Sequence, residues 1–124
     1  MGDNKGYITS TDERGSINIS EEVIALIAAS AATEVEGVHG LFMSHGRDLA
    51  QMLSRKSLSR GVKIGVEEKN VTIDINIMAD MGCAVNEVGA EVQKAVKSAV
   101  EAAAGLTVNT VNIHICGIYL KKDK

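Results

Sequence analysis

Five residues have side chains that could bind a metal ion: His39, His45, His114, Cys83 and Cys116. Zinc ligands usually come in close pairs, because one turn or one helix face then supplies two of them. Here His39 and His45 are six residues apart, and the two cysteines form no close pair. The spacing therefore predicts structural histidines and reduced, unpaired thiols, with no metal site.

Cys83 is the candidate for nucleophilic catalysis. It precedes a predicted helix, and the positive end of a helix dipole favours the reactive thiolate form. A nucleophile also needs a base within reach and a third group that orients the base. The sequence places neither group beside Cys83. Asp74 and Asp80 could form a pair of carboxylates on one strand face, but charged residues on a solvated strand face need no catalytic explanation. We therefore expect no enzyme, with a cysteine-dependent enzyme as an alternative.

Phosphate and nucleic acid are poorly matched ligands. Gly82, Gly89 and Gly105 fit neither the P-loop nor the dinucleotide-binding pattern. Aromatic residues make up 2% of the chain and the net charge is −3, whereas nucleic-acid binders are usually basic and stack bases on aromatic rings. We expect no cofactor and no nucleic-acid partner.

A basic segment is the strongest binding candidate. Residues 40–63 carry five basic residues and one acidic residue, a net charge of +4, so the remainder of the chain carries −7. Apolar residues at helical spacing predict a short amphipathic helix over 47–58. Such a helix could bind an acidic protein or anionic lipid, or it could simply cap the core. The candidate partner-binding residues are Arg47, Leu49, Met52, Leu53, Arg55, Lys56 and Arg60.

The elements that position these residues begin with one conspicuous strand. Apolar residues occupy every second position from Val71 to Ala79, which is typical of a strand with one buried face. A polar turn at 67–70 joins it to a strand over 62–66. Earlier in the chain we expect a strand over 15–19, a helix over 21–36 capped by Ser20, and a strand over 38–43. The small residues 28–32 would let a neighbouring element or subunit approach this helix closely.

A second helix is predicted from an N-cap at Asn86 to Gly105. Its apolar stripe consists of Val88, Val92, Val96, Ala99 and Ala103.

The last strand changes parity. Leu106 and Val108 occupy even positions, whereas Val111, Ile113 and Ile115 occupy odd positions. A straight strand cannot bury both sets, so we expect a bulge at residues 109–110.

The element order β-α-β-(short α)-β-β-α-β predicts an α+β two-layer sandwich, with two long helices on one face of a mixed sheet. We expect a flexible N-terminal tail over 1–14, which could end in a short strand, a single domain over 15–120 and a C-terminal tail over 121–124. The chain shows neither a signal peptide nor an apolar run of membrane-spanning length, so we expect a cytoplasmic protein.

Three stretches of the chain resemble one family: GSINISEEVIALIAASAATEVEGVHGL, VTIDINIMADMG, and VNEVGAEVQKAVKSAVEAAAGLTVNTVNIHICGIYL. The family is the alkaline shock proteins, the envelope stress response proteins of Gram-positive bacteria, and the resemblance covers residues 15–120. It implies a small, abundant cytoplasmic protein without catalysis that self-associates. Some members are held near the membrane by a separate anchored partner. This chain departs from the family in its short charged tails and in Met81, where an aromatic residue often stands.

The resemblance thus implies a non-enzymatic envelope stress response protein. We expect a self-associating scaffold or adaptor, a homo-oligomer that docks protein partners near the cytoplasmic face of the membrane. The alternative within the family is a regulator of a carboxylase complex in fatty-acid synthesis.

Overall fold

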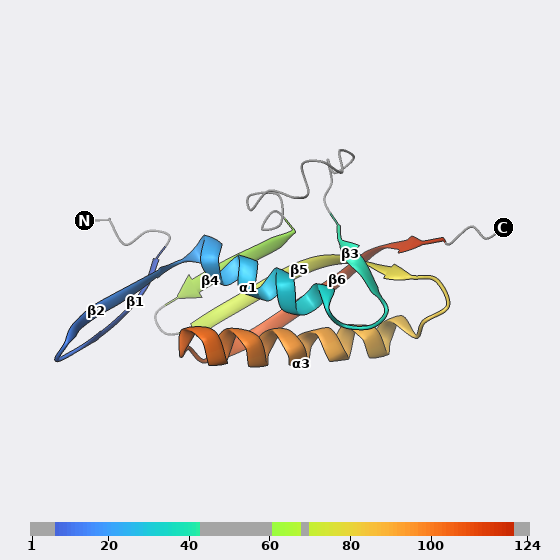
Figure 1. Cartoon of the computed structure of the whole chain (residues 1–124). Helices are drawn as coiled ribbons and strands as arrows, with labels where there is room; N and C mark the ends of the chain where they lie inside the picture. The colour runs from blue at the N-terminus through green and yellow to red at the C-terminus, as the bar shows by residue number, and fades with distance from the viewer. Residues whose placement is uncertain (1–6, 43–60, 68–69, 121–124) are drawn as a thin grey trace.

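The computed structural model describes residues 7–42, 61–67 and 70–120. These residues form a mixed sheet with two helices and a projecting hairpin (Figure 1). The elements are β1 (Tyr7–Asp12), β2 (Gly15–Ser20), α1 (Glu21–Thr33), β3 (Val38–Leu41), β4 (Val62–Glu67), β5 (Asn70–Asp80), α3 (Val85–Ala104) and β6 (Val108–Tyr119). No helix in these ranges is both long enough and apolar enough to cross a membrane.

Strand β5 is the centre of the sheet. Strand β6 pairs with it in parallel along one edge, while β4 and β3 pair with it antiparallel along the other. Strand β4 pairs with residues Asn70–Ile75 of β5, and β3 pairs with residues Ile77–Ala79 of β5. The two short strands therefore lie end to end along one edge. Asn76 fills the gap, because its carbonyl accepts the Phe42 N–H (2.8 Å) and its N–H donates to the Gly61 carbonyl (2.9 Å). The predicted mixed sheet and α+β class are confirmed.

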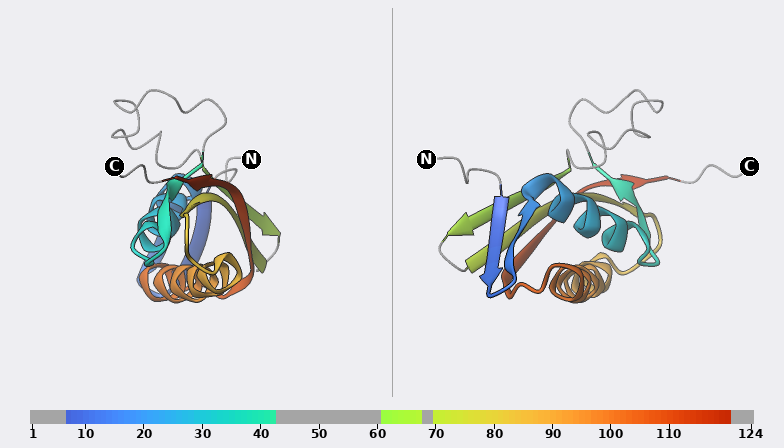
Figure 2. Two further views of the ribbon diagram at one scale, coloured as in Figure 1. Left: turned by 90° about the vertical axis from the view of Figure 1, so that its right-hand side faces the viewer. Right: turned by 60° about the vertical axis from the view of Figure 1, so that its left-hand side comes forward.

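Both helices lie on one face of the sheet (Figure 2). Helix α1 contacts α3, β3 and β4, and α3 contacts β6. Between the layers, Ile73, Ile75 and Ile77 of β5 are fully buried. Each fully buried side chain of this size stabilises the fold by about 1.5–3 kcal/mol relative to an exposed one.

The buried stripe of α3 differs from the prediction in its second half. Val88, Val92, Val96 and Val100 are buried, whereas Ala99 is half-buried and Ala103 is exposed. Steps of four along the whole helix keep the larger valines against the sheet, and the two alanines are left beside α1.

Residues 7–14 are not a flexible tail, so that prediction was wrong for this stretch. Strand β1 pairs antiparallel with β2, with Ile8 opposite Ile19, and both isoleucines pack against the core. The hairpin projects from the body (Figure 1). At its tip the Arg14 guanidinium donates to Asp12 at 2.8 Å and lowers the pKa of that carboxyl. Abundant threonine and serine made this strand look like a tail in the sequence.

The predicted bulge is confirmed. Val108 pairs with Val71 and Thr110 with Thr72, so Asn109 is the extra residue. Its side-chain oxygen accepts the Val71 N–H at 3.1 Å, which occupies a backbone donor beside the irregularity. Val108 and Val111 are thereby both buried in one continuous strand.

The helix ends agree only partly with the sequence. Ser20 caps α1 as predicted, accepting the Val23 N–H at 3.2 Å, but α1 ends at Thr33 and not at residue 36. Helix α3 begins at Val85 with Ala84 at the N-cap and no side-chain cap bond, so the predicted cap at Asn86 was wrong. Asn86 lies within the first turn. Gly105 ends α3 in a left-handed conformation, as predicted.

This assignment of caps can be tested by alanine substitution. Ser20→Ala should lower the free energy of unfolding by about 1 kcal/mol, because it removes the cap of α1. Asn86→Ala should change it by less than about 0.5 kcal/mol, because Asn86 caps nothing. Urea denaturation measures both variants, and a larger loss for Asn86→Ala than for Ser20→Ala would restore the sequence prediction.

A glycine pair tests the packing of the turn between α1 and β3. Gly37 and Gly82 have nearly the same positive φ, 100° and 99°, so alanine strains the backbone similarly at both. A Cβ at Gly37 would lie 2.6 Å from Cγ2 of Val88, whereas a Cβ at Gly82 has no atom within 4 Å. Gly37→Ala should therefore cost about 1–3 kcal/mol more than Gly82→Ala in urea denaturation. Equal losses would mean that Gly37 does not pack against α3.

Candidate partner-binding surfaces

The seven candidate residues named from the sequence, from Arg47 to Arg60, lie outside the described residues. The structure does describe where their segment joins the sheet. Phe42 and Gly61 are both hydrogen-bonded to Asn76, so the segment 43–60 begins and ends at one point of the β3–β4 edge. The segment is therefore an insertion between two strands that β5 holds independently.

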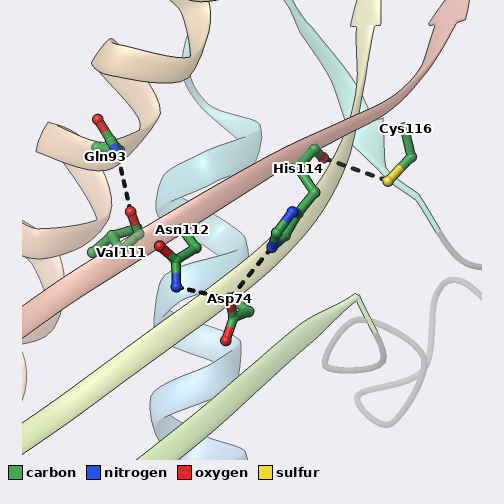
Figure 3. A network of polar contacts seen from close by, with 6 residues as sticks. All are labelled: Asp74, Gln93, Val111, Asn112, His114 and Cys116. Carbon is green, nitrogen blue, oxygen red and sulfur yellow. Dashed lines mark hydrogen bonds and ion pairs between the residues drawn. The ribbon is translucent and has the colours of Figure 1, made fainter.

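The face of the sheet away from the helices carries a polar cluster (Figure 3). Asp74 accepts hydrogen bonds from Asn112 Nδ2 at 2.9 Å and contacts His114 Nε2 at 3.3 Å. Lys63 and Asn76 lie beside it, around an open hollow of about 320 Å³. The side chains of Asp74 and His114 are 36% and 52% exposed. Solvent therefore screens this pair, and its effect on stability is small.

The second acidic residue of that face has its own histidine. Nδ1 of His39 lies 3.2 Å from Asp80 Oδ1, and the His39 ring stacks on Tyr119 with centroids 3.8 Å apart. Asp74 and Asp80 thus share a face, as the alternation predicted, but each contacts a histidine and not the other carboxylate. The interpretation of His39 and His114 as structural residues agrees with these contacts.

Cys83 lies between the α1–β3 turn and the start of α3. Its thiol is half-buried and donates to the Asp80 carbonyl at 2.9 Å. Within the described ranges no histidine is hydrogen-bonded to this thiol, and no three His, Cys, Asp or Glu residues are placed to hold a metal ion. The structure thus adds no base to the nucleophile hypothesis.

Sequence reasoning missed a groove between the two helices. One hollow of about 640 Å³ lies along α3 beside the end of α1, and another of about 450 Å³ follows it. Glu34 and Val35 are consecutive, as are Ser98 and Ala99, so the linings of the two hollows adjoin. We call this surface the helix groove. The small side chains that line it are Ser30, Ala31, Ala95, Ser98, Ala99 and Ala103, and the charged ones are Glu34, Glu36, Glu87, Glu91 and Lys94.

The run of small residues in α1 was the available signal for this groove, because it predicted close approach by a neighbour. That neighbour is α3, and the groove is what the small side chains leave between the two helices. Ala99 and Ala103 concealed it, since the sequence counted them as part of the buried stripe.

The geometry defines a small α+β domain with an insertion at a sheet edge, a polar sheet face and a groove between its helices. Comparison with known proteins identifies the family. The model of the alkaline shock protein 23 family, described by a cell envelope-related function, matches residues 9–120. The chain belongs to this family, as the sequence motifs indicated.

The relatives include proteins of two genera. The uncharacterized protein Spy1535 of Streptococcus pyogenes is 40% identical over 114 residues, which cover 91% of this chain and 86% of that protein. The uncharacterized protein YloU of Bacillus subtilis is 37% identical, covering 84% and 88%. A stress response regulator gls24 homolog of S. pyogenes is 27% identical, covering 94% and 69%. Among solved structures, a MamM CTD variant gives a TM-score of 0.48 at 17% identity, covering 82% and 96%.

The environments of the two cysteines make different predictions for alkylation. Cys116 is exposed and its thiol lies 3.6 Å from the His114 carbonyl, whereas Cys83 is half-buried and its thiol donates to the Asp80 carbonyl at 2.9 Å. Single-cysteine variants carrying Cys83→Ser or Cys116→Ser should show Cys116 reacting with iodoacetamide about tenfold faster or more. In urea the two rates should become equal. Faster labelling of native Cys83 would instead favour the cysteine-dependent enzyme.

Proposed function

We propose that this protein is a non-catalytic scaffold or adaptor of the envelope stress response, which self-associates and docks protein partners through the inserted segment 43–60. The family has a cell envelope-related function, and a relative is named as a stress response regulator homolog. The described side chains offer contacts typical of a solvated surface, with histidines paired to exposed carboxylates. Both facts support a protein that works through its exterior.

One observation carries the proposal. Phe42 and Gly61 both hydrogen-bond to Asn76, so the hydrogen-bond ladder along this edge of β5 is continuous. Strands β3 and β4 are therefore each held in register by β5, independently of the residues between them. A segment that the sheet does not need can carry residues selected for binding. This one carries Arg47, Arg55, Lys56 and Arg60, the densest basic group before the C-terminus. An acidic partner protein is the complementary ligand.

Replacing residues 45–60 with a short Gly-Ser linker tests the assignment. Far-UV circular dichroism should remain nearly unchanged, because β3 and β4 keep their pairing to β5. Cross-linked pull-down from cells of the source organism, read by mass spectrometry, should lose the partners that the wild-type chain captures. If the chain with the linker still captures the same partners, the segment is not the partner-binding site.

A charge-matched pair makes the test sharper. Arg55→Gln/Lys56→Gln should weaken capture, whereas Lys121→Gln/Lys122→Gln removes the same charge from the C-terminus and should not. The captured proteins also separate the two functions within the family. Membrane-anchored partners favour the scaffold, and carboxylase subunits would favour the regulator.

A further inference from the structure

The helix groove has the shape and charge of a site for a helix. Its walls are α1 and α3, and its lining combines small side chains with the larger apolar ones of Leu26, Ile27, Val35 and Val88. From Ala84 to Ala103 the lining follows α3 for about 30 Å at 1.5 Å per residue. Four glutamates and one lysine line it, a net charge of −3. None of these glutamates forms an ion pair within the part of the chain that the structure describes.

The chain itself contains the complementary ligand. Residues 47–60 carry four basic residues and Asp48, a net charge of +3. The helix predicted over 47–58 would be about 18 Å long, shorter than the groove. Its apolar residues Leu49, Met52 and Leu53 match the apolar part of the lining, and its basic residues match the glutamates. An amphipathic helix that lays its apolar side into a groove is a common mode of peptide recognition.

The attachment points prevent the whole of the helix predicted over 47–58 from lying in the groove of its own copy. Helix α1 contacts β3 and β4, the strands next to Phe42 and Gly61, and it also lines the groove, so it lies between these two residues and the groove. With a helix diameter of about 10 Å, the outer groove lies about 15 Å from the strands. Leu58 is three residues from Gly61, which limits its reach to about 11 Å. A second copy has no such restraint.

We propose that the helix groove of one copy binds the basic segment 47–60 of a second copy. This inference rests on the proposed self-association and specifies the contact. The two contacting surfaces differ, so the interface is heterologous, and successive copies build a ring or a filament and not an isolated twofold dimer.

Charge reversal in both surfaces tests the proposal. Glu87→Lys/Glu91→Lys makes the groove basic, and Arg55→Glu/Lys56→Glu makes the segment acidic. Each variant alone should need about tenfold more protein than the wild type to assemble, as measured by sedimentation velocity at low salt. An equimolar mixture of the two variants should recover large assemblies, because each basic surface then meets an acidic one on the other chain.

Glu13→Lys/Glu67→Lys is the matched control. It makes the same change of charge on β4 and at the hairpin tip, away from the groove, and should leave the sedimentation profile close to that of the wild type. Circular dichroism verifies that every variant is folded. Loss of assembly in this control, or failure of the mixture to recover assemblies, would mean that net charge and not the groove governs association.

A bulky residue in the floor gives an independent measurement. Ala103 is exposed, so Ala103→Trp should leave the fold intact while it fills the groove and reduces assembly by a similar factor. Assemblies that persist in this variant and in both reversals would overturn the groove contact but leave the self-associating scaffold in place. A wild-type chain that stays monomeric up to millimolar concentration would overturn both.

Discussion

The structure depends on the complete burial of one face of the central strand β5. The alternate side chains of β5 from Val71 to Ala79 are at most 2% exposed, which requires that its backbone be hydrogen-bonded along both edges. Strand β6 satisfies one edge over nearly the full length of β5. The second edge of β5 is shared by β4 and β3. Between them, Phe42 and Gly61 hydrogen-bond to Asn76 and complete the ladder.

This divided edge has a consequence for function. A strand pair that is not joined directly can accept an insertion without loss of core burial, because neither strand relies on the connection for its register. The segment inserted at this position carries basic residues, while Glu36, Glu87 and Glu91 lie in the turn after α1 and on α3. Opposite charges on different surfaces of one chain favour contacts between unlike surfaces and oppose a face-to-face pairing of identical ones.

The sequence predicted the parts of this fold that depend on local periodicity. The alternation in β5 specified its buried face, and the parity change between Val108 and Val111 specified the bulge before any partner strand was known. The cap of α1 was likewise local, because Ser20 bonds a donor three residues away. By contrast, no side chain caps α3 at its start at Val85. The sequence therefore pointed to Asn86, a favourable cap residue that lies inside the first turn. The first hairpin was missed because its isoleucines are isolated among polar residues.

The candidate surfaces divide in the same way. Charge and helical spacing were enough to single out the basic segment, since both are properties of consecutive residues. The helix groove could not be predicted, because it exists only where α1 and α3 lie side by side. In addition, helical spacing alone is compatible with burial of either Ala99 or Val100 in the apolar stripe of α3. The larger valine faces the core, where it removes more apolar area from water, and the smaller alanine is left to line the groove.

The many alanine and serine side chains in the lining of the groove limit the strength of a contact made there. Small side chains bury little area, and exposed ion pairs are each worth less than about 1 kcal/mol, so one docked helix binds weakly and in a salt-dependent way. A copy inside a ring or filament makes two such contacts, one with its groove and one with its segment, and it leaves only when both are broken. A closed ring, in which every copy makes both contacts, therefore forms over a narrower range of protein concentration than an open filament, whose end copies are each held by one contact.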